Sequence, residues 1–187
     1  LYTTPLEMNH LVAYDCGLAG IRLFSGPLNL NHCTVYGGTN HGIEAFAAWN
    51  GDVVNTISWN NGLNNYEGFD PGEVRYSNGS PSLAGMDGNI NEDPLFVDEG
   101  NGDFNLTYPD SPCLDSGDPL SANDIDGSRA DMGAYELDQG IPQLFCIAAP
   151  NSGGTGGFIG TTGTCSYVAN DFGLTLTSAI PNQPVLP

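Results

Sequence analysis

The chain has 187 residues, of which 22 are acidic and only three are basic, so its formal net charge at pH 7 is −19. A surface of that sign repels phosphate backbones, which makes nucleic acid a poor candidate partner. The 26 Gly and 13 Pro residues indicate dense turns and favour alternating strands and turns over helices. The 40% of hydrophobic residues can form a core, but no apolar run reaches the roughly 20 residues that a membrane helix needs.

The first two segments of the chain repeat one another at a fixed spacing. PLEMNHLVAYDCGLAGIRLF, which begins at Pro5, matches PLNLNHCTVYGGTNHGIEAF, which begins at Pro27, without a gap. A fixed period of this length is the sequence signature of a solenoid. We therefore expect equivalent residues of the two copies to lie one above the other.

Each copy predicts three short strands separated by tight turns. In the second copy, Leu28 and Leu30 alternate with polar residues before Asn31 interrupts the pattern. Cys33 and Val35 continue the apolar set, and HGIEAF supplies the third strand. Turns of this kind, stacked about 4.8 Å apart, form a right-handed parallel β-helix. The predicted fold class is therefore all-β.

A third copy is expected around VVNTISWNN, in which Asn55 matches Asn31. This match requires a turn that is two positions longer than the one between the first two copies. It places Asn9, Asn31 and Asn55 in a ladder at one corner, where Asn tolerates left-handed backbone. It also predicts that Ile57 and Trp59 face the interior.

From residue 89 the sequence resembles the closing segment of secreted bacterial right-handed parallel β-helix proteins. The matching elements are Asp93-Pro94-Leu95-Phe96, Asp103-Phe104-Asn105-Leu106, Ser111-Pro112-Cys113-Leu114-Asp115-Ser116-Gly117 and Asp131-Met132-Gly133-Ala134-Tyr135-Glu136. Many such proteins are described only as β-helix-repeat or choice-of-anchor proteins, and some are pectate-lyase-like enzymes. The resemblance implies the architecture and a secreted or cell-surface location, but little about activity, because a fold does not determine function.

We expect parallel β-helix turns over 1–94, their closing segment over 95–138 and a small C-terminal β module over 139–187. The last segment resembles a module at the C-termini of secreted bacterial proteins, through Cys146, Asn151-Ser152 and Ala169-Asn170-Asp171-Phe172 before LTLT. The chain starts within a repeat and ends where that module would continue, so we expect it to be a piece of a longer protein.

The five cysteines leave the redox state open. Cys146 and Cys165 lie in one Gly/Thr-rich stretch and are the expected disulfide pair, which would imply an oxidising compartment. The alternative is five reduced thiols, with Cys33 as a core residue. The connectivity of Cys16, Cys33 and Cys113 is not predicted.

The outward-facing residues that follow the Asn corner suggest a carbohydrate-binding surface. Its candidate residues are His10, Tyr14, His32, Tyr36 and Asn60. Stacked Tyr rings beside imidazole and amide groups offer a sugar both apolar ring faces and polar edges. The alternative is an ordinary ladder of side chains that stabilises the sheet.

The stretch NDIDGSRADMGAYE is the densest polar cluster. Asp124, Asp126 and Asp131 are candidate ligands for Ca²⁺, which takes six to eight oxygen atoms. The alternative is a structural ion pair in which Arg129 reaches one of these carboxylates.

Three functions fit the sequence. The first is a secreted or cell-surface scaffold that binds or adheres to extracellular polysaccharide. The second is a calcium-stabilised structural module. The third is the C-terminal part of a polysaccharide lyase or glycoside hydrolase with its active site upstream. Asp52, Glu67, Asp70 and Glu73 could supply a carboxylate pair for hydrolysis. No nucleophile arrangement, phosphate loop or zinc pattern is present, so enzymatic activity is left open, as is the oligomeric state.

Overall fold

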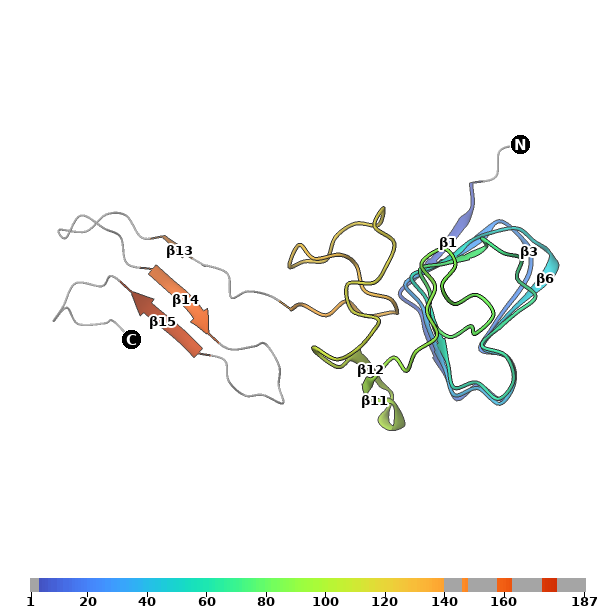
Figure 1. Cartoon of the computed structure of the whole chain (residues 1–187), viewed down its shortest axis with the longest axis horizontal. Helices are drawn as coiled ribbons and strands as arrows, with labels where there is room; N and C mark the ends of the chain where they lie inside the picture. Colours follow the sequence, from blue (N-terminus) through green and yellow to red (C-terminus); the bar gives the residue numbers. More distant parts are fainter. Residues whose placement is uncertain (1–3, 140–145, 148–157, 163–172, 178–187) are drawn as a thin grey trace. The chain divides into compact units, whose positions relative to one another are not determined.

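The computed structural model describes residues 4–139 and the segments 146–147, 158–162 and 173–177 (Figure 1). The chain divides into two units, Leu1–Leu137 and Asp138–Pro187. In the described residues the one helical element is the 3-10 turn η1 (Glu99–Asn101), and no helix is long and apolar enough to cross a membrane.

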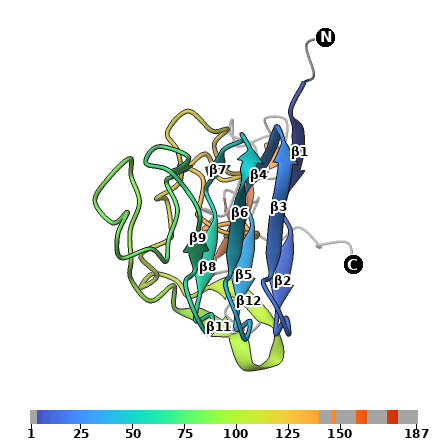
Figure 2. The ribbon, with the colours of Figure 1, turned by 90° about the vertical axis from the view of Figure 1, so that its right-hand side faces the viewer.

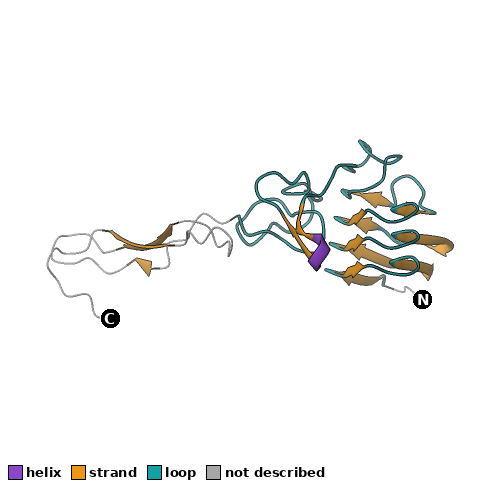
Figure 3. Ribbon diagram, turned by 90° about the horizontal axis from the view of Figure 1, so that it is seen from below, coloured by secondary structure: helices purple, strands orange, loops and turns teal. Residues whose placement is uncertain are grey.

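The first unit is a parallel β-solenoid of about three turns, built from three sheets (Figures 2 and 3). The first sheet contains β1 (Leu6–Asn9), β4 (Leu28–Asn31), β7 (Val53–Val54) and β10 (Val74–Arg75). The second contains β2 (Val12–Tyr14), β5 (Thr34–Tyr36) and β8 (Ile57–Trp59). The third contains β3 (Ile21–Gly26), β6 (Ile43–Trp49) and β9 (Tyr66–Glu67). The predicted all-β class is confirmed.

The first two turns stack in the register that the repeat predicts. Leu6 pairs with Leu28 and Asn9 with Asn31 in the first sheet. Tyr14 pairs with Tyr36 in the second sheet, and Ile21 with Ile43 in the third. The sequence match between the two copies therefore reports a direct contact between neighbouring turns.

The third turn lies one residue out of the predicted register. Asn31 pairs with Val54 where the sequence match predicts Asn55, and Thr34 pairs with Ile57. The spacing between the second and third turns is therefore one position longer than that between the first and second. The additional residue enters at a bulge between β3 and β6, where Leu23 pairs with Ala45 but Ser25 pairs with Ala48.

This register corrects two predictions. Asn55 lies above His32 instead of Asn31, so the asparagine ladder stops at the second turn. Because successive side chains of a strand point to opposite faces, a shift of one residue also reverses β8. Ile57 and Trp59 therefore stack on Thr34 and Tyr36 on the outer face, while Ser58 lies over Val35.

The solenoid interior is filled by aliphatic side chains from all three sheets. Leu30, Ile43 and Val53 are fully buried, and Val35 and Val74 are 1% exposed. Cys33 belongs to this core and is a free thiol, as expected for a buried cysteine that behaves as a small apolar residue.

A second core forms between the outer face of the second sheet and residues 96–132. The antiparallel strands β11 (Phe96–Asp98) and β12 (Asp103–Leu106) supply Phe96, Phe104 and Leu106. These side chains cluster with Ile57 and Met132. The closing segment thus covers the flank of the second sheet and anchors itself there.

The second unit contains an antiparallel sheet of β13 (Cys146–Ile147), β14 (Phe158–Thr162) and β15 (Gly173–Thr177). Cys165 lies outside the described residues, so the predicted disulfide between Cys146 and Cys165 stays a prediction.

Candidate functional site

The residues predicted to bind carbohydrate lie together along the outer face of the second sheet. The rings of His10 and His32 stack with their centroids 5.1 Å apart. Tyr14 and Tyr36 are register partners, and the Nδ2 of Asn60 donates to the hydroxyl of Tyr36 at 3.0 Å. The two histidines thus form one stacked pair, and Tyr14, Tyr36 and Asn60 form a second group.

The closing segment occupies much of this face. The ring centroid of Tyr36 is 5.4 Å from that of Phe104 and 5.9 Å from that of Phe96. Tyr14 also contacts Phe104, at 5.3 Å, but keeps 51% of its surface exposed. His32 is 8% exposed. The contacts thus leave His10, Tyr14 and Asn60 as the exposed members, and carbohydrate binding here stays a prediction.

Hydrogen bonds define the tautomer of the buried His32. The Oδ1 of Asn55 accepts the backbone N–H of Asp118 at 2.6 Å, which fixes the orientation of that amide. The Nδ2 of Asn55 must then donate to the Nε2 of His32, at 2.8 Å. The proton of the imidazole consequently lies on Nδ1, which is 2.7 Å from the Oε1 of Glu136.

Glu136 sits between this imidazole and a cluster of aspartates. Burial alone raises the pKa of its carboxyl, but hydrogen bonds from His32, Asp124 and the backbone N–H of Asp131 outweigh burial and lower the pKa to about 2. Glu136 therefore stays ionised in the closing segment, where it contacts both the solenoid and the neighbouring carboxyl groups.

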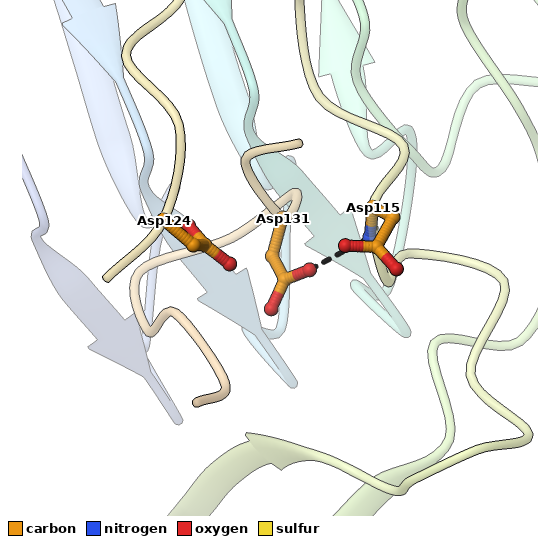
Figure 4. Close-up of side chains that lie close together, drawn as sticks. All are labelled: Asp115, Asp124 and Asp131. Atoms are coloured by element: carbon orange, nitrogen blue, oxygen red, sulfur yellow. Dashed lines mark hydrogen bonds between the residues drawn. The ribbon is translucent and has the colours of Figure 1, made fainter. Parts of the chain in front are cut away.

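Three aspartates from separate parts of the closing segment converge beside Glu136. Asp115, Asp124 and Asp131 each offer a carboxylate oxygen, and these atoms lie within 4.8 Å of one another (Figure 4). Asp131 is fully buried and accepts the backbone N–H groups of Asp115 and Leu137, at 2.7 and 2.8 Å. The cluster is therefore held in place by the backbone.

The predicted metal ligands are only partly in this cluster. Asp124 and Asp131 belong to it, but Asp126 does not, and its Oδ1 instead accepts the backbone N–H of Ser128 at 2.8 Å. Asp115, which the sequence analysis did not assign to a metal site, takes the third position. Its backbone has a φ of 50°, in the left-handed region that Asp tolerates.

The cluster carries more negative charge than the fold compensates. Burial, followed by Glu136 and the other nearby carboxylates, raises the pKa of Asp124 to about 8. Burial likewise raises the pKa of Asp131 to about 6, although its backbone hydrogen bonds oppose this effect. Near neutral pH the cluster thus retains a proton, and a cation could replace that proton.

The predicted alternative, an ion pair of Arg129 with a carboxylate, is not found in the part of the chain that the structure describes. Arg129 instead donates to the carbonyl of Ser116 at 3.3 Å, and its guanidinium carbon lies 5.4 Å from the ring centroid of Tyr76.

The outer face of the third sheet carries an aromatic pair that the sequence analysis did not assign to a site. The rings of Phe24 and Phe46 stack with centroids 4.7 Å apart and an interplanar angle of 11°. The guanidinium carbon of Arg22 lies 5.4 and 5.3 Å from the two centroids, and its Nε donates to Glu44 at 2.8 Å. Phe24 is 59% exposed. The available signal was the match of Phe24 with Phe46 in the repeat.

Three of the four carboxylates considered for hydrolysis have local partners. Asp52 binds Arg75 through both of its oxygens, at 3.1 and 3.2 Å, and Glu67 accepts a hydrogen bond from Asn64. Glu73 accepts the backbone N–H of Asp70. These contacts are those of structural residues and leave enzymatic activity an open question.

Comparisons with models of protein families, with curated proteins and with solved structures find no match to this chain.

Proposed function

We propose that the chain is a scaffold module of a secreted or cell-surface bacterial protein, and that it contacts neutral polysaccharide through the outer face of its third sheet. The observation that supports this proposal most is the stack of the exposed Phe24 on the partly buried Phe46, with Arg22 and Glu44 beside it. We call these four residues the aromatic face.

The aromatic face offers what a sugar ring needs. Aromatic rings take up the apolar C–H faces of sugars, while the guanidinium and the carboxylate provide polar groups for hydroxyls. The strands below are rigid because Ile21, Leu23 and Ile43 point into the core, so the four side chains are held in place before binding. The charge of −19 disfavours acidic polysaccharides and so favours neutral ones.

Affinity electrophoresis in gels that contain mannan, xylan or a soluble cellulose derivative tests this proposal, with pectate as the acidic comparison. We expect the chain to be retarded by at least one neutral polymer and not by pectate. The double variant Phe24→Ala/Phe46→Ala should migrate as it does without polymer, whereas Leu63→Ala, a variant of a comparably exposed residue at 61%, should be retarded normally. Free migration of the unmodified chain in every gel refutes the proposal.

A second candidate function is that of a calcium-stabilised module, favoured by the convergence of Asp115, Asp124 and Asp131. Burial and the neighbouring carboxylates raise the pKa of Asp124, and calcium would favour its ionised form, so that binding would release a proton. The expected result is a melting temperature that rises with added CaCl₂ and falls with chelator, more strongly above pH 8 than at pH 6. Asp124→Asn should abolish the shift and Asp98→Asn should not, and equal melting curves with CaCl₂ and chelator exclude this function.

A further inference from the structure

A polar groove lies between the outer face of the first sheet and the loop that follows Asp118. Its volume is about 230 Å³, and successive turns of the solenoid contribute to one wall. From this wall Glu7, Asn29, Asp52 and Arg75 line the groove, at the levels of β1, β4, β7 and β10 in turn. The groove is separate from the aromatic face, which belongs to the third sheet.

The opposite wall is fixed by a fully buried side chain. Asn55 accepts the backbone N–H of Asp118 at 2.6 Å and donates to the Oγ of Ser121 at 2.8 Å. Asp118 and Ser121 both line the groove. Because Asn55 is 0% exposed and is held in turn by His32, both walls are positioned by the solenoid itself.

Several side-chain donors of the solenoid wall are used within it. The Nδ2 of Asn29 donates to the Oε1 of Glu7 at 2.8 Å. Arg75 donates through two nitrogens to the two carboxylate oxygens of Asp52. Each carboxylate oxygen has more than one lone pair, so Glu7 and Asp52 can accept further hydrogen bonds beyond these.

The charge of the groove and its unpaired hydrogen-bond acceptor both favour a ligand that is positively charged and donates hydrogen bonds. Three carboxylates, Glu7, Asp52 and Asp118, face one guanidinium, that of Arg75, which leaves a net negative groove. Asn31 also lines the groove, and its Oδ1 is buried without a hydrogen-bond partner. A ligand that brings several N–H donors and a positive charge would match this surface.

The groove is not a metal site by the geometry of its carboxylates. Within the described residues, the one group of three potential ligands with mutually close oxygen atoms is Asp115, Asp124 and Asp131, none of which lines the groove. An anion would meet the three carboxylates and be repelled. From these observations we infer that the groove binds a primary ammonium group carried by a small organic molecule, such as an amino sugar or an aliphatic diamine.

NMR titration of the whole chain, labelled with ¹⁵N, tests this inference. Glucosamine is the amino-sugar probe, 1,5-diaminopentane is the aliphatic probe, and glucose is the neutral match to glucosamine. We expect saturable shifts of the side-chain amide signals of Asn29 and Asn31 with at least one amine, no such shifts with glucose, and weaker binding at higher ionic strength. Response to both amines assigns recognition to the ammonium group, and response to glucosamine alone assigns it to an amino sugar.

Two variants locate the binding. Asp118→Asn keeps an acceptor for the backbone N–H of Leu120, so the loop should hold its position. It should nevertheless weaken amine binding about threefold or more, because one groove charge is removed. Asp110→Asn removes an exposed carboxylate that does not line the groove and should leave the affinity unchanged. The inference is overturned if neither amine shifts these signals, if glucose shifts them equally, or if the two variants bind alike.

Discussion

The side-chain amide of Asn55 in the third turn of the solenoid donates a hydrogen bond to the imidazole of His32 in the second turn, with 2.8 Å between Nδ2 and Nε2. The same amide holds the backbone of Asp118 and the hydroxyl of Ser121, and the carbonyl of Asn55 accepts the N–H of Gly133. One buried corner residue therefore ties the third turn both to the second turn and to the closing segment.

Replacement of Asn55 should be far more costly than replacement of another corner asparagine. Asn55→Ala leaves the backbone N–H of Asp118 and the Nε2 of His32 without partners and keeps a left-handed φ of 51°, so we expect a loss of about 3 kcal/mol in the free energy of unfolding. Asn60→Ala is the matched control, because Asn60 has a φ of 55° but is exposed. Urea denaturation measures both, and equal losses would show that backbone strain alone, and not the hydrogen bonds, accounts for the effect.

The contact of Glu136 with His32 makes stability depend on acid pH. Its pKa falls from 4.5 to about 2 on folding, so the contribution is complete above pH 4.5 and is lost as pH falls toward about 2. Glu136→Gln keeps an acceptor for the Nδ1 proton, so we expect a loss of about 1 kcal/mol near neutral pH and a flatter acid limb. The midpoint of urea denaturation, measured as a function of pH for the unmodified chain and for the variant, tests this expectation. An acid limb that is unchanged in the variant would contradict this role for Glu136.

Asp124 should produce the opposite dependence, between pH 3.8 and about pH 8. Its pKa rises from 3.8 to about 8 on folding, so its contribution is complete below 3.8 and is lost as pH rises through 8. Without added calcium, the unmodified chain should therefore melt at progressively lower temperatures as the pH rises through this range. Asp124→Asn has no titrating group at this position. It should lose the part of this dependence above about pH 6, where the raised pKa of Asp131 no longer contributes. Thermal melts in the presence of chelator measure the difference. A parallel decline in the variant would assign this loss of stability to other groups.

The solenoid core should respond to truncation as a close-packed interior does. Leu30 is fully buried in the second turn, and Leu30→Ala should lower the free energy of unfolding by about 2–5 kcal/mol. Leu18→Ala removes a side chain that is 64% exposed and should change it by less than about 0.5 kcal/mol. Similar midpoints for the two variants in urea would show that Leu30 is not part of a packed core.

The fold of the first two turns could be predicted because their sequences match without a gap. Equivalent positions carry side chains of similar size and polarity, such as Leu6 and Leu28, since each turn rests on the next. The third turn could not be placed as well, because its additional residue is absorbed by a bulge between β3 and β6. The identity of Asn55 with Asn31 was misleading, since a corner accepts either Asn or His in left-handed backbone.

The sites were harder to predict because they depend on contacts between distant segments. The carboxyl groups of Asp115 and Asp131 meet only after the closing segment has folded back on itself, and no short motif encodes that approach. The residues that cover Tyr36 left a weak signal in DFNL, where Phe104 and Leu106 alternate with polar residues as in a strand that buries one face.

Backbone nuclear Overhauser effects between neighbouring turns test the central structural claim most directly. In a parallel sheet, amide and α protons of paired strands lie close enough to give such contacts. We expect them between Asn9 and Asn31 in the first two turns, and between Asn31 and Val54 in the second and third. Contacts between Asn31 and Asn55 in place of Val54, or the short-range pattern of a helix over 5–59, would contradict the solenoid register on which the aromatic face and the groove depend.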